Sequence, residues 1–253
     1  MASRGVVFDS SLFWTHNDAG NPPQLFALDT EGNLVGRVTL VGATTTDWED
    51  IEAGPCSAGD CLYVADIGDN GGERESISIY LVPEPREPFE AVTPVATLRA
   101  RFPEGRWDAE ALFTLPNGSI YIVTKGREGP IVLYALSADG NPVSGTEAGV
   151  LRRIRQLLPP PVDELDRVTA ATATPDGRWV AIRTYRALLL YPAASLVAGD
   201  PLEPAVVDLS GLGHPQGESV AMSDDGSVWL TSEAEGGGAP ALWSRLQCDL
   251  PGG

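Results

Sequence analysis

Short stretches in which apolar and polar residues alternate recur along the whole chain. Five of them share a similar run of large apolar residues, such as Leu-Phe-Ala-Leu or Leu-Tyr-Ala-Leu, and they lie in residues 24–29, 76–85, 131–137, 187–193 and 241–247. A period of two is the period of a β-strand, so each stretch predicts a strand. Turn sequences such as Pro-Asn-Gly at 116–118 and Pro-Asp-Gly at 175–177 separate the stretches, as hairpins require. The pattern predicts an all-β chain.

A longer phrase repeats around these strands. An acidic or small run leads into an apolar segment, and an apolar strand with an aromatic residue follows about a dozen residues later. The clearest copies begin at residues 47 and 108, and weaker copies begin at 168 and 217. Repeats of about 40–60 residues, each built from four short strands, are typical of a β-propeller. We therefore expect one β-propeller domain over residues 1–253, with five blades of four antiparallel strands; six blades are the alternative if the termini build an extra blade.

The repeat also aligns a column of residues on the first strand of each unit. In a propeller this strand lies beside the central channel, so a carboxylate repeated in the column becomes part of a ring. The column reads Glu49, Glu110, Thr169 and Glu218. The ends of the second strands add further charged groups at the same mouth: Asp18, Asp66, Lys125, Arg183 and Glu233.

So many carboxylates cannot all remain ionised and unpaired in a partly dry channel. One solution is a divalent cation, and calcium prefers six to eight oxygen ligands of this kind. We expect Glu49, Asp66, Glu110 and Glu218 as its ligands. The alternative is a salt-bridge network in which Lys125 and Arg183 pair with the glutamates. The sequence leaves both open.

Two further features near the predicted mouth could carry chemistry. The loop over residues 66–75 offers the side-chain oxygens of Asp66, Asp69 and Asn70 around a glycine turn, either as a calcium loop or as an ordinary polar hairpin loop. His16 lies two residues from Asp18, so this pair could act in catalysis, with His16 as general base, or His16 could be a polar rim residue.

The charge balance limits the partners. The formal net charge is −18, from 35 acidic and 17 basic residues, which argues against nucleic acid or an anionic membrane surface. Most of this charge is explained by solubility. Since no apolar run reaches the length of a membrane span, we expect no membrane insertion. We expect a monomer that could bind a small-molecule or extended ligand.

The cysteines bear on localisation. Cys56 and Cys61 flank a small turn between two predicted strands, where a disulfide can form. A disulfide would indicate a secreted or periplasmic protein whose leader is absent from this chain, whereas two free thiols would fit a cytoplasmic one. Cys248 is expected to fill space beside the last strand.

The phrases WTHNDAG, DWEDIEAG, LYVADIGDN, LVPEP, DAEAL, VTKG and GES resemble those of a bacterial family of mostly exported, poorly characterised propellers. More distantly, the chain is similar to the gluconolactonase/regucalcin, SdiA-regulated and esterase-like phytase propellers. The resemblance implies an axial divalent metal and a mouth acid acting as base. We thus expect an exported propeller that binds a ligand, with a divalent cation, at an acidic mouth. The alternatives are a metal-dependent hydrolase of lactones or phosphoesters and a protein-interaction scaffold.

Overall fold

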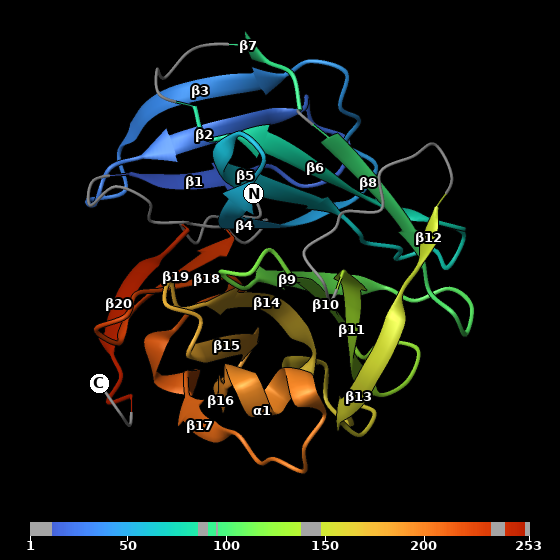
Figure 1. The fold of residues 1–253 in the computed structure, drawn as a ribbon. Coiled ribbons are helices and arrows are strands. Elements are labelled where there is room, and N and C mark those ends of the chain that lie inside the picture. Colours follow the sequence, from blue (N-terminus) through green and yellow to red (C-terminus); the bar gives the residue numbers. More distant parts are fainter. Residues whose placement is uncertain (1–11, 86–90, 95, 138–147, 234–240, 251–253) are drawn as a thin grey trace.

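Five small β-sheets follow one another around the molecule in the computed structural model (Figure 1). The structure describes residues 12–85, 91–94, 96–137, 148–233 and 241–250. We number the sheets as blades 1 to 5 in chain order. In Figure 1 they run from the blue strands at the top to the red strands at the left. The predicted five-bladed all-β propeller is confirmed.

The blades share one plan, an antiparallel meander that runs outward from the channel. Blade 1 contains β1 (Phe13–His16), β2 (Gln24–Leu28) and β3 (Leu34–Leu40). Blade 2 contains β4 (Trp48–Cys56), β5 (Gly59–Asp66), β6 (Ile77–Pro83) and β8 (Ala96–Arg101). Blade 3 contains β9 (Ala109–Thr114), β10 (Ile120–Thr124), β11 (Ile131–Ser137) and β13 (Arg152–Leu158).

The last two blades continue the plan. Blade 4 contains β14 (Val168–Ala173), β15 (Trp179–Thr184), β16 (Ala187–Pro192) and β17 (Ala205–Asp208). Blade 5 contains β18 (Gln216–Met222), β19 (Ser227–Glu233) and β20 (Trp243–Gln247). Two 3₁₀ turns, Glu164–Asp166 and Ser210–Leu212, lie in the connections on either side of blade 4.

The innermost strands β4, β9, β14 and β18 contact one another in sequence around the channel. Between blades 5 and 1, the ring of Phe13 packs on Trp229 and Trp243, with centroid distances of 5.5 and 4.7 Å. The sequence over residues 2–8 resembles a first strand for blade 1, but it lies outside the described residues.

The core consists of apolar side chains between neighbouring blades. The aromatic residues of the repeated strands contribute to it, since Trp14, Tyr63 and Tyr121 are buried. The position of Trp48 beside Glu49 makes it a candidate for lining the channel, but the structure does not place it there. Trp48 is fully buried in the cluster between blades 1 and 2, and its indole Nε1 donates to the backbone oxygen of Thr44 at 2.6 Å. The strand turns this side chain toward the neighbouring blade because apolar burial is worth more there.

Connections from two blades pair with the outer edge of the preceding blade, and a third packs in the core beside the preceding blade. The two-residue strand β7 (Ala91–Val92) leaves blade 2 and pairs in parallel with β3 of blade 1. In the same way β12 (Gly149–Val150) leaves blade 3 and pairs in parallel with β8 of blade 2. In blade 4 the corresponding connection forms the helix α1 (Ala193–Ala198). Its buried Leu196 packs in the cluster shared by blades 3 and 4. These connections protect strand edges that would otherwise be open to pairing.

The cysteines and the helices also bear on the predictions made from the sequence. A disulfide joins Cys56 and Cys61 across the β4–β5 hairpin, as predicted. Cys248 is buried in the cluster between blades 4 and 5. In the part of the chain that the structure describes, no helix has the length and apolar character to cross a membrane.

Candidate metal centre at the channel mouth

A β-bulge occupies the same place on all four described inner strands. The regular pairing skips one residue between Trp48 and Asp50, between Ala109 and Ala111, between Val168 and Ala170, and between Gly217 and Ser219. The skipped residues are the members of the predicted column: Glu49, Glu110, Thr169 and Glu218. A bulge re-aims the side chain of its extra residue and is common next to functional sites. The repeat noticed in the sequence is therefore a repeated irregularity of the backbone.

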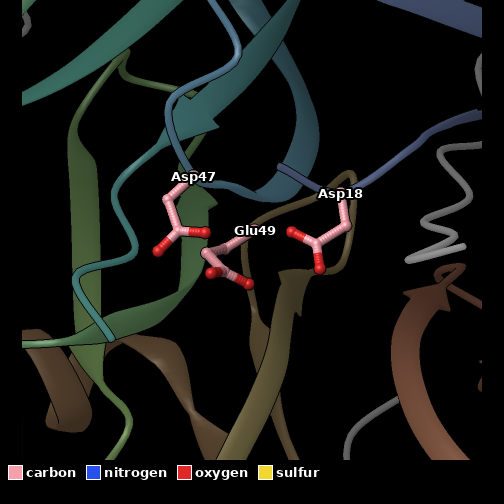
Figure 2. A group of neighbouring side chains, drawn as sticks. All are labelled: Asp18, Asp47 and Glu49. Atoms are coloured by element: carbon pink, nitrogen blue, oxygen red, sulfur yellow. The ribbon is translucent and has the colours of Figure 1, made fainter. Parts of the chain in front are cut away.

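Three carboxylates from two blades meet at this mouth. One oxygen each of Asp18, Asp47 and Glu49 lies within 4.8 Å of the other two, and Figure 2 shows the three carboxyl groups turned toward one another. Asp18 follows β1 and is exposed, whereas Asp47 and Glu49 stand at the start of β4 and are half-buried. Burial raises the pKa of Asp47, and the neighbouring Asp18 raises it further.

The backbone around Asp47 is fixed by Asp66 at the end of β5. The carboxylate of Asp66 accepts hydrogen bonds from the backbone nitrogens of Thr46 and Asp47, at 3.4 and 3.0 Å. It also forms an ion pair with Arg74 at 2.8 Å and is almost fully buried. Asp66 was predicted as a metal ligand; the structure places it behind the three-carboxylate group, where it orients Asp47.

Gly68 makes room for the group. A Cβ atom at this position would overlap the Oε1 of Glu49 and would lie 2.6 Å from the Oδ2 of Asp47. The loop that contains Gly68 also supplies a donor, because the backbone N–H of Asn70 bonds the carboxylate of Asp47 and lowers its pKa against the stronger effect of burial.

The other side-chain oxygens of this loop, predicted as calcium ligands, accept hydrogen bonds from within the protein. Asp69 accepts from the backbone nitrogens of Glu73 and Arg74 at 2.8 and 3.0 Å. The Oδ1 of Asn70 accepts from Arg127. These bonds close the turn, which is the geometry of a polar hairpin loop.

Glu110 lies deeper in the channel and links the group to Lys125. Its carboxyl group hydrogen-bonds Glu49 and forms an ion pair with Lys125, whose Nζ also lies 3.8 Å from the Oδ2 of buried Asp108. Burial raises the pKa of Glu110 to about 7, although Lys125 opposes the rise. Burial is the main cause that raises the pKa of Glu49 well above its ordinary value, and the negative charge of Glu110 raises it further. For Lys125, burial disfavours the charge, but Glu110 and Asp108 outweigh it and raise its pKa.

Glu218 and Tyr185 complete the mouth on the side of blades 4 and 5. Burial, followed by the charge of Glu110, raises the pKa of Glu218 to about 8. Burial is the main cause that raises the pKa of the Tyr185 phenol, and the charge of Glu218 raises it further. The charge of Lys125 lowers it. Tyr185 therefore stands at the blade that lacks a column glutamate, and sequence reasoning missed it.

Arg183 lies beside Glu218, whose carboxyl group raises the pKa of Arg183 against the stronger effect of burial. It is fully buried between blades 4 and 5, where its Nη1 donates to the backbone oxygens of Ser219 and Thr231 at 2.5 and 2.7 Å and its Nη2 bonds His214 at 2.9 Å. The register pairs Thr184 with Val168 and Thr124 with Ala109, so the counterpart of Lys125 is Tyr185 and not Arg183. Arg183 is therefore not the equivalent of Lys125, because the register, which decides the place of each side chain, sets it two residues earlier on its strand.

His16 is also away from solvent. Its ring is fully buried against Trp48, with a centroid distance of 5.7 Å, and its Nδ1 lies 3.0 Å from the backbone oxygen of Asn17. Of the predicted catalytic pair, Asp18 alone is exposed at the carboxylate group. Their role in catalysis stays a prediction.

Comparisons with known proteins support the architecture. No protein-family model matches the chain, and no curated protein matches its sequence. Among solved structures, the major allergen Mala s 1 of Malassezia sympodialis is similar over 91% of this chain and 87% of its own, with a TM-score of 0.55 and 12% sequence identity. The calcium-binding protein regucalcin from Agrobacterium tumefaciens strain C58 is similar over 97% of this chain and 70% of its own, with a TM-score of 0.49 and 17% identity. At 12% identity, the likeness to Mala s 1 supports the fold and nothing more.

Proposed function

We propose that this propeller binds a divalent cation, calcium in the first place, through Asp18, Asp47 and Glu49 at the mouth of its channel. One observation carries the proposal: oxygens of the three carboxylates lie within 4.8 Å of one another. Calcium binds oxygens at about 2.3–2.6 Å, so two of its ligands can lie as far as roughly 5 Å apart. The three oxygens are therefore close enough for one calcium ion to draw them together, and the exposure of Asp18 leaves room for waters or a ligand.

The charge balance of the mouth supports a cation. Among the described residues, six carboxyl groups gather there, and the basic groups that act on them are Lys125, Arg183 beside Glu218 and Arg74, which acts on Asp47. The six are Asp18, Asp47, Glu49, Asp108, Glu110 and Glu218. Lys125 pairs with Glu110 and lies farther from Asp108, so it compensates the deep part of the mouth. The salt bridge and the cation thus serve different carboxylates, and the two alternatives from the sequence become complementary.

The cation would serve to hold a ligand at the mouth. A calcium ion held by three side chains keeps open coordination positions, because calcium takes six to eight oxygens. A carboxylate, phosphate or sugar oxygen of a small or extended ligand could fill them. The chain would act as an exported binding protein, a location that the Cys56–Cys61 disulfide supports, since disulfides persist in oxidising compartments. We expect a monomer.

Calcium titration of the chelator-treated protein tests this function. We expect saturable binding by calorimetry and a higher melting temperature with calcium, both lost in Asp47→Asn. Glu31→Gln, an exposed glutamate on a turn of blade 1, is the control and should bind as the wild type does. No binding heat and no calcium-dependent melting shift would overturn the proposal.

A metal-dependent hydrolase of lactones or phosphoesters is the second candidate. It is favoured by the pKa values of Glu110 and Glu218, raised to about 7 and about 8, which suit groups that exchange protons near neutral pH. In this candidate the cation polarises the substrate and Asp18 is the exposed acid beside it. Turnover of lactone, phosphoester or aryl-ester substrates that requires calcium and falls in Glu110→Gln would support it. Turnover that is unchanged in Asp18→Asn and Glu49→Gln would exclude this site.

A further inference from the structure

The chain contains two asparagines that are each followed by glycine, Asn70-Gly71 and Asn117-Gly118. Asparagine is heat-labile, because the backbone nitrogen of the following residue can attack its side-chain carbonyl carbon. Glycine allows the closest approach, since it has no Cβ atom. Both asparagines are exposed, the first in the loop over residues 66–75 beside the mouth and the second in the turn between β9 and β10. The sequence therefore offers two equivalent sites, and the fold decides between them.

The turn between β9 and β10 holds the second pair in hydrogen bonds. The backbone nitrogen of Gly118, the atom that would attack, donates to the backbone oxygen of Leu115 at 2.8 Å. The Oδ1 of Asn117 accepts from the backbone nitrogen of Ser119 at 3.0 Å. Because the bond from Gly118 must break before its nitrogen can attack, the fold protects Asn117.

The loop beside the mouth leaves the first pair open. Its turn is closed one residue later, by the bond from the nitrogen of Gly72 to the oxygen of Asp69 at 2.9 Å. The nitrogen of Gly71 donates no hydrogen bond to any residue that the structure describes. Gly71 is exposed, so water can take the proton that this nitrogen must lose. A cation also lies on the group under attack, because the Nη1 of Arg127 donates to the Oδ1 of Asn70.

We propose that Asn70 is a site of spontaneous deamidation, in which Arg127 stabilises the reacting carbonyl group. The nitrogen of Gly71 loses its proton to solvent and forms a bond to the Cγ of Asn70. The oxygen on this carbon becomes negative in the tetrahedral intermediate, and the guanidinium of Arg127 stabilises that charge as an oxyanion hole does. The bond between Cγ and Nδ2 then breaks, and Nδ2 takes up a proton and leaves as ammonia. One water molecule opens the resulting succinimide ring, which leaves aspartate or isoaspartate at position 70.

The product adds a negative charge at the edge of the mouth. The backbone N–H of Asn70 bonds the carboxylate of Asp47, so the new carboxylate arises on a residue that contacts the three-carboxylate group. Arg127 becomes its ion-pair partner, and a charge-assisted pair replaces a bond to a neutral amide. Isoaspartate also lengthens the loop backbone by one methylene group. The reaction needs only the protein and water, so the proposal is independent of the cation at the mouth.

Peptide mapping by mass spectrometry tests the site on the intact protein. The folded protein is incubated at mildly alkaline pH and then digested at acidic pH, which suppresses further reaction. We expect Asn70 to deamidate about tenfold or more faster than Asn117, because its pair has a free nucleophile and a cation on the carbonyl group. The same protein in denaturant is the control, since two identical pairs should then react at similar rates. The same ratio of rates in the folded and the denatured protein would overturn the proposal, as would an unchanged Asn70.

Three variants test the mechanism. Gly71→Ala should slow the reaction, because a Cβ atom hinders the attacking nitrogen, and it should fold, because that atom would meet nothing closer than Glu73 at 3.5 Å. Arg127→Met should slow the reaction about tenfold or more. Arg106→Met is the matched control and should react as the wild type does, since Arg106 donates to the backbone oxygen of Gly72 in the same loop at 3.1 Å. An unchanged or faster rate in Arg127→Met would refute the role of Arg127, and an unchanged rate in Gly71→Ala would refute attack by Gly71.

Discussion

Gly68 lies so close to Glu49 that a single added methyl group would overlap the glutamate's Oε1. The same methyl group would lie 2.6 Å from the Oδ2 of Asp47, so the two carboxylates share the space that glycine leaves. The absence of a side chain at Gly68 therefore lets the two carboxyl groups lie close together, and a cation between them would favour their ionised forms.

Substituting Gly68 should accordingly damage cation binding. In Gly68→Ala the Cβ atom forces the carboxylates of Asp47 and Glu49 apart, and we expect calcium affinity to fall about tenfold or more by calorimetry. Gly71→Ala is the matched control in the same loop, since its Cβ would meet nothing closer than Glu73 at 3.5 Å. Equal affinities in the two variants would show that the spacing set by Gly68 does not matter.

Stability should depend on pH through Glu218. Its pKa is about 8 in the fold, against an ordinary value of 4.5, so the folded chain holds a proton here that the unfolded chain has released. This contribution to stability is fully present below pH 4.5 and is lost as the pH rises through 8. Glutamine stays neutral throughout this range. In the presence of a chelator, the melting temperature of Glu218→Gln should therefore rise relative to that of the wild type as the pH increases from 5 to 8.5. A constant difference between the two proteins across that range would contradict the assignment, and Glu31→Gln should show no such trend.

Two arginines three residues apart should have opposite importance for stability. Arg183 is fully buried, and burial lowers its pKa to about 10. Arg183→Met would leave the backbone oxygens of Ser219 and Thr231 without their donor, which should cost about 2–4 kcal/mol of unfolding free energy. Arg186 is partly exposed and pairs with Asp163 and Asp166 at 2.6 and 3.0 Å. Arg186→Met should cost less than about 1 kcal/mol in the same denaturant titration. Comparable losses of unfolding free energy in the two variants would mean that the buried hydrogen bonds of Arg183 do not stabilise the fold.

The disulfide gives a chemical test of the framework. Thiol counting in denaturant should find one reactive cysteine, Cys248, before reduction and three after it. A Cys56→Ser, Cys61→Ser double variant should unfold about 2 kcal/mol more easily, because the unfolded chain loses a short cross-linked loop. Three reactive thiols in the unreduced protein would refute the cross-link.

The blade count and the column of Glu49, Glu110, Thr169 and Glu218 could be predicted because both repeat. Strand alternation and the acidic phrase each occur once per blade, so errors at one copy are corrected by the others. The bulge that aims each column residue at the channel could not be predicted, because a skipped pairing leaves no mark in a single strand's alternation.

The partners of the column were harder to predict for the same reason. Arg183 and Tyr185 are two residues apart, and an alignment of strand ends without the register selects Arg183 as the equivalent of Lys125. Asp47 meets Asp18 of another blade, and such a contact between blades leaves no local pattern in the sequence. The segments β7, β12 and α1 went unpredicted because two-residue strands and a six-residue helix are too short to carry a period.

The backward reach of β7, β12 and α1 sets an order of completion during synthesis. Blade 1 gains its outermost strand only when residues 91–92 have left the ribosome, and blade 2 only when residues 149–150 have done so. Blades 1 and 2 thus stay incomplete until part of the following blade has been synthesised. A nascent chain that stalls inside one blade exposes the open edge of the blade before it. Since such edges invite pairing with other chains, translation pauses within blade 2 or blade 3 should be the points at which this protein depends most on chaperones.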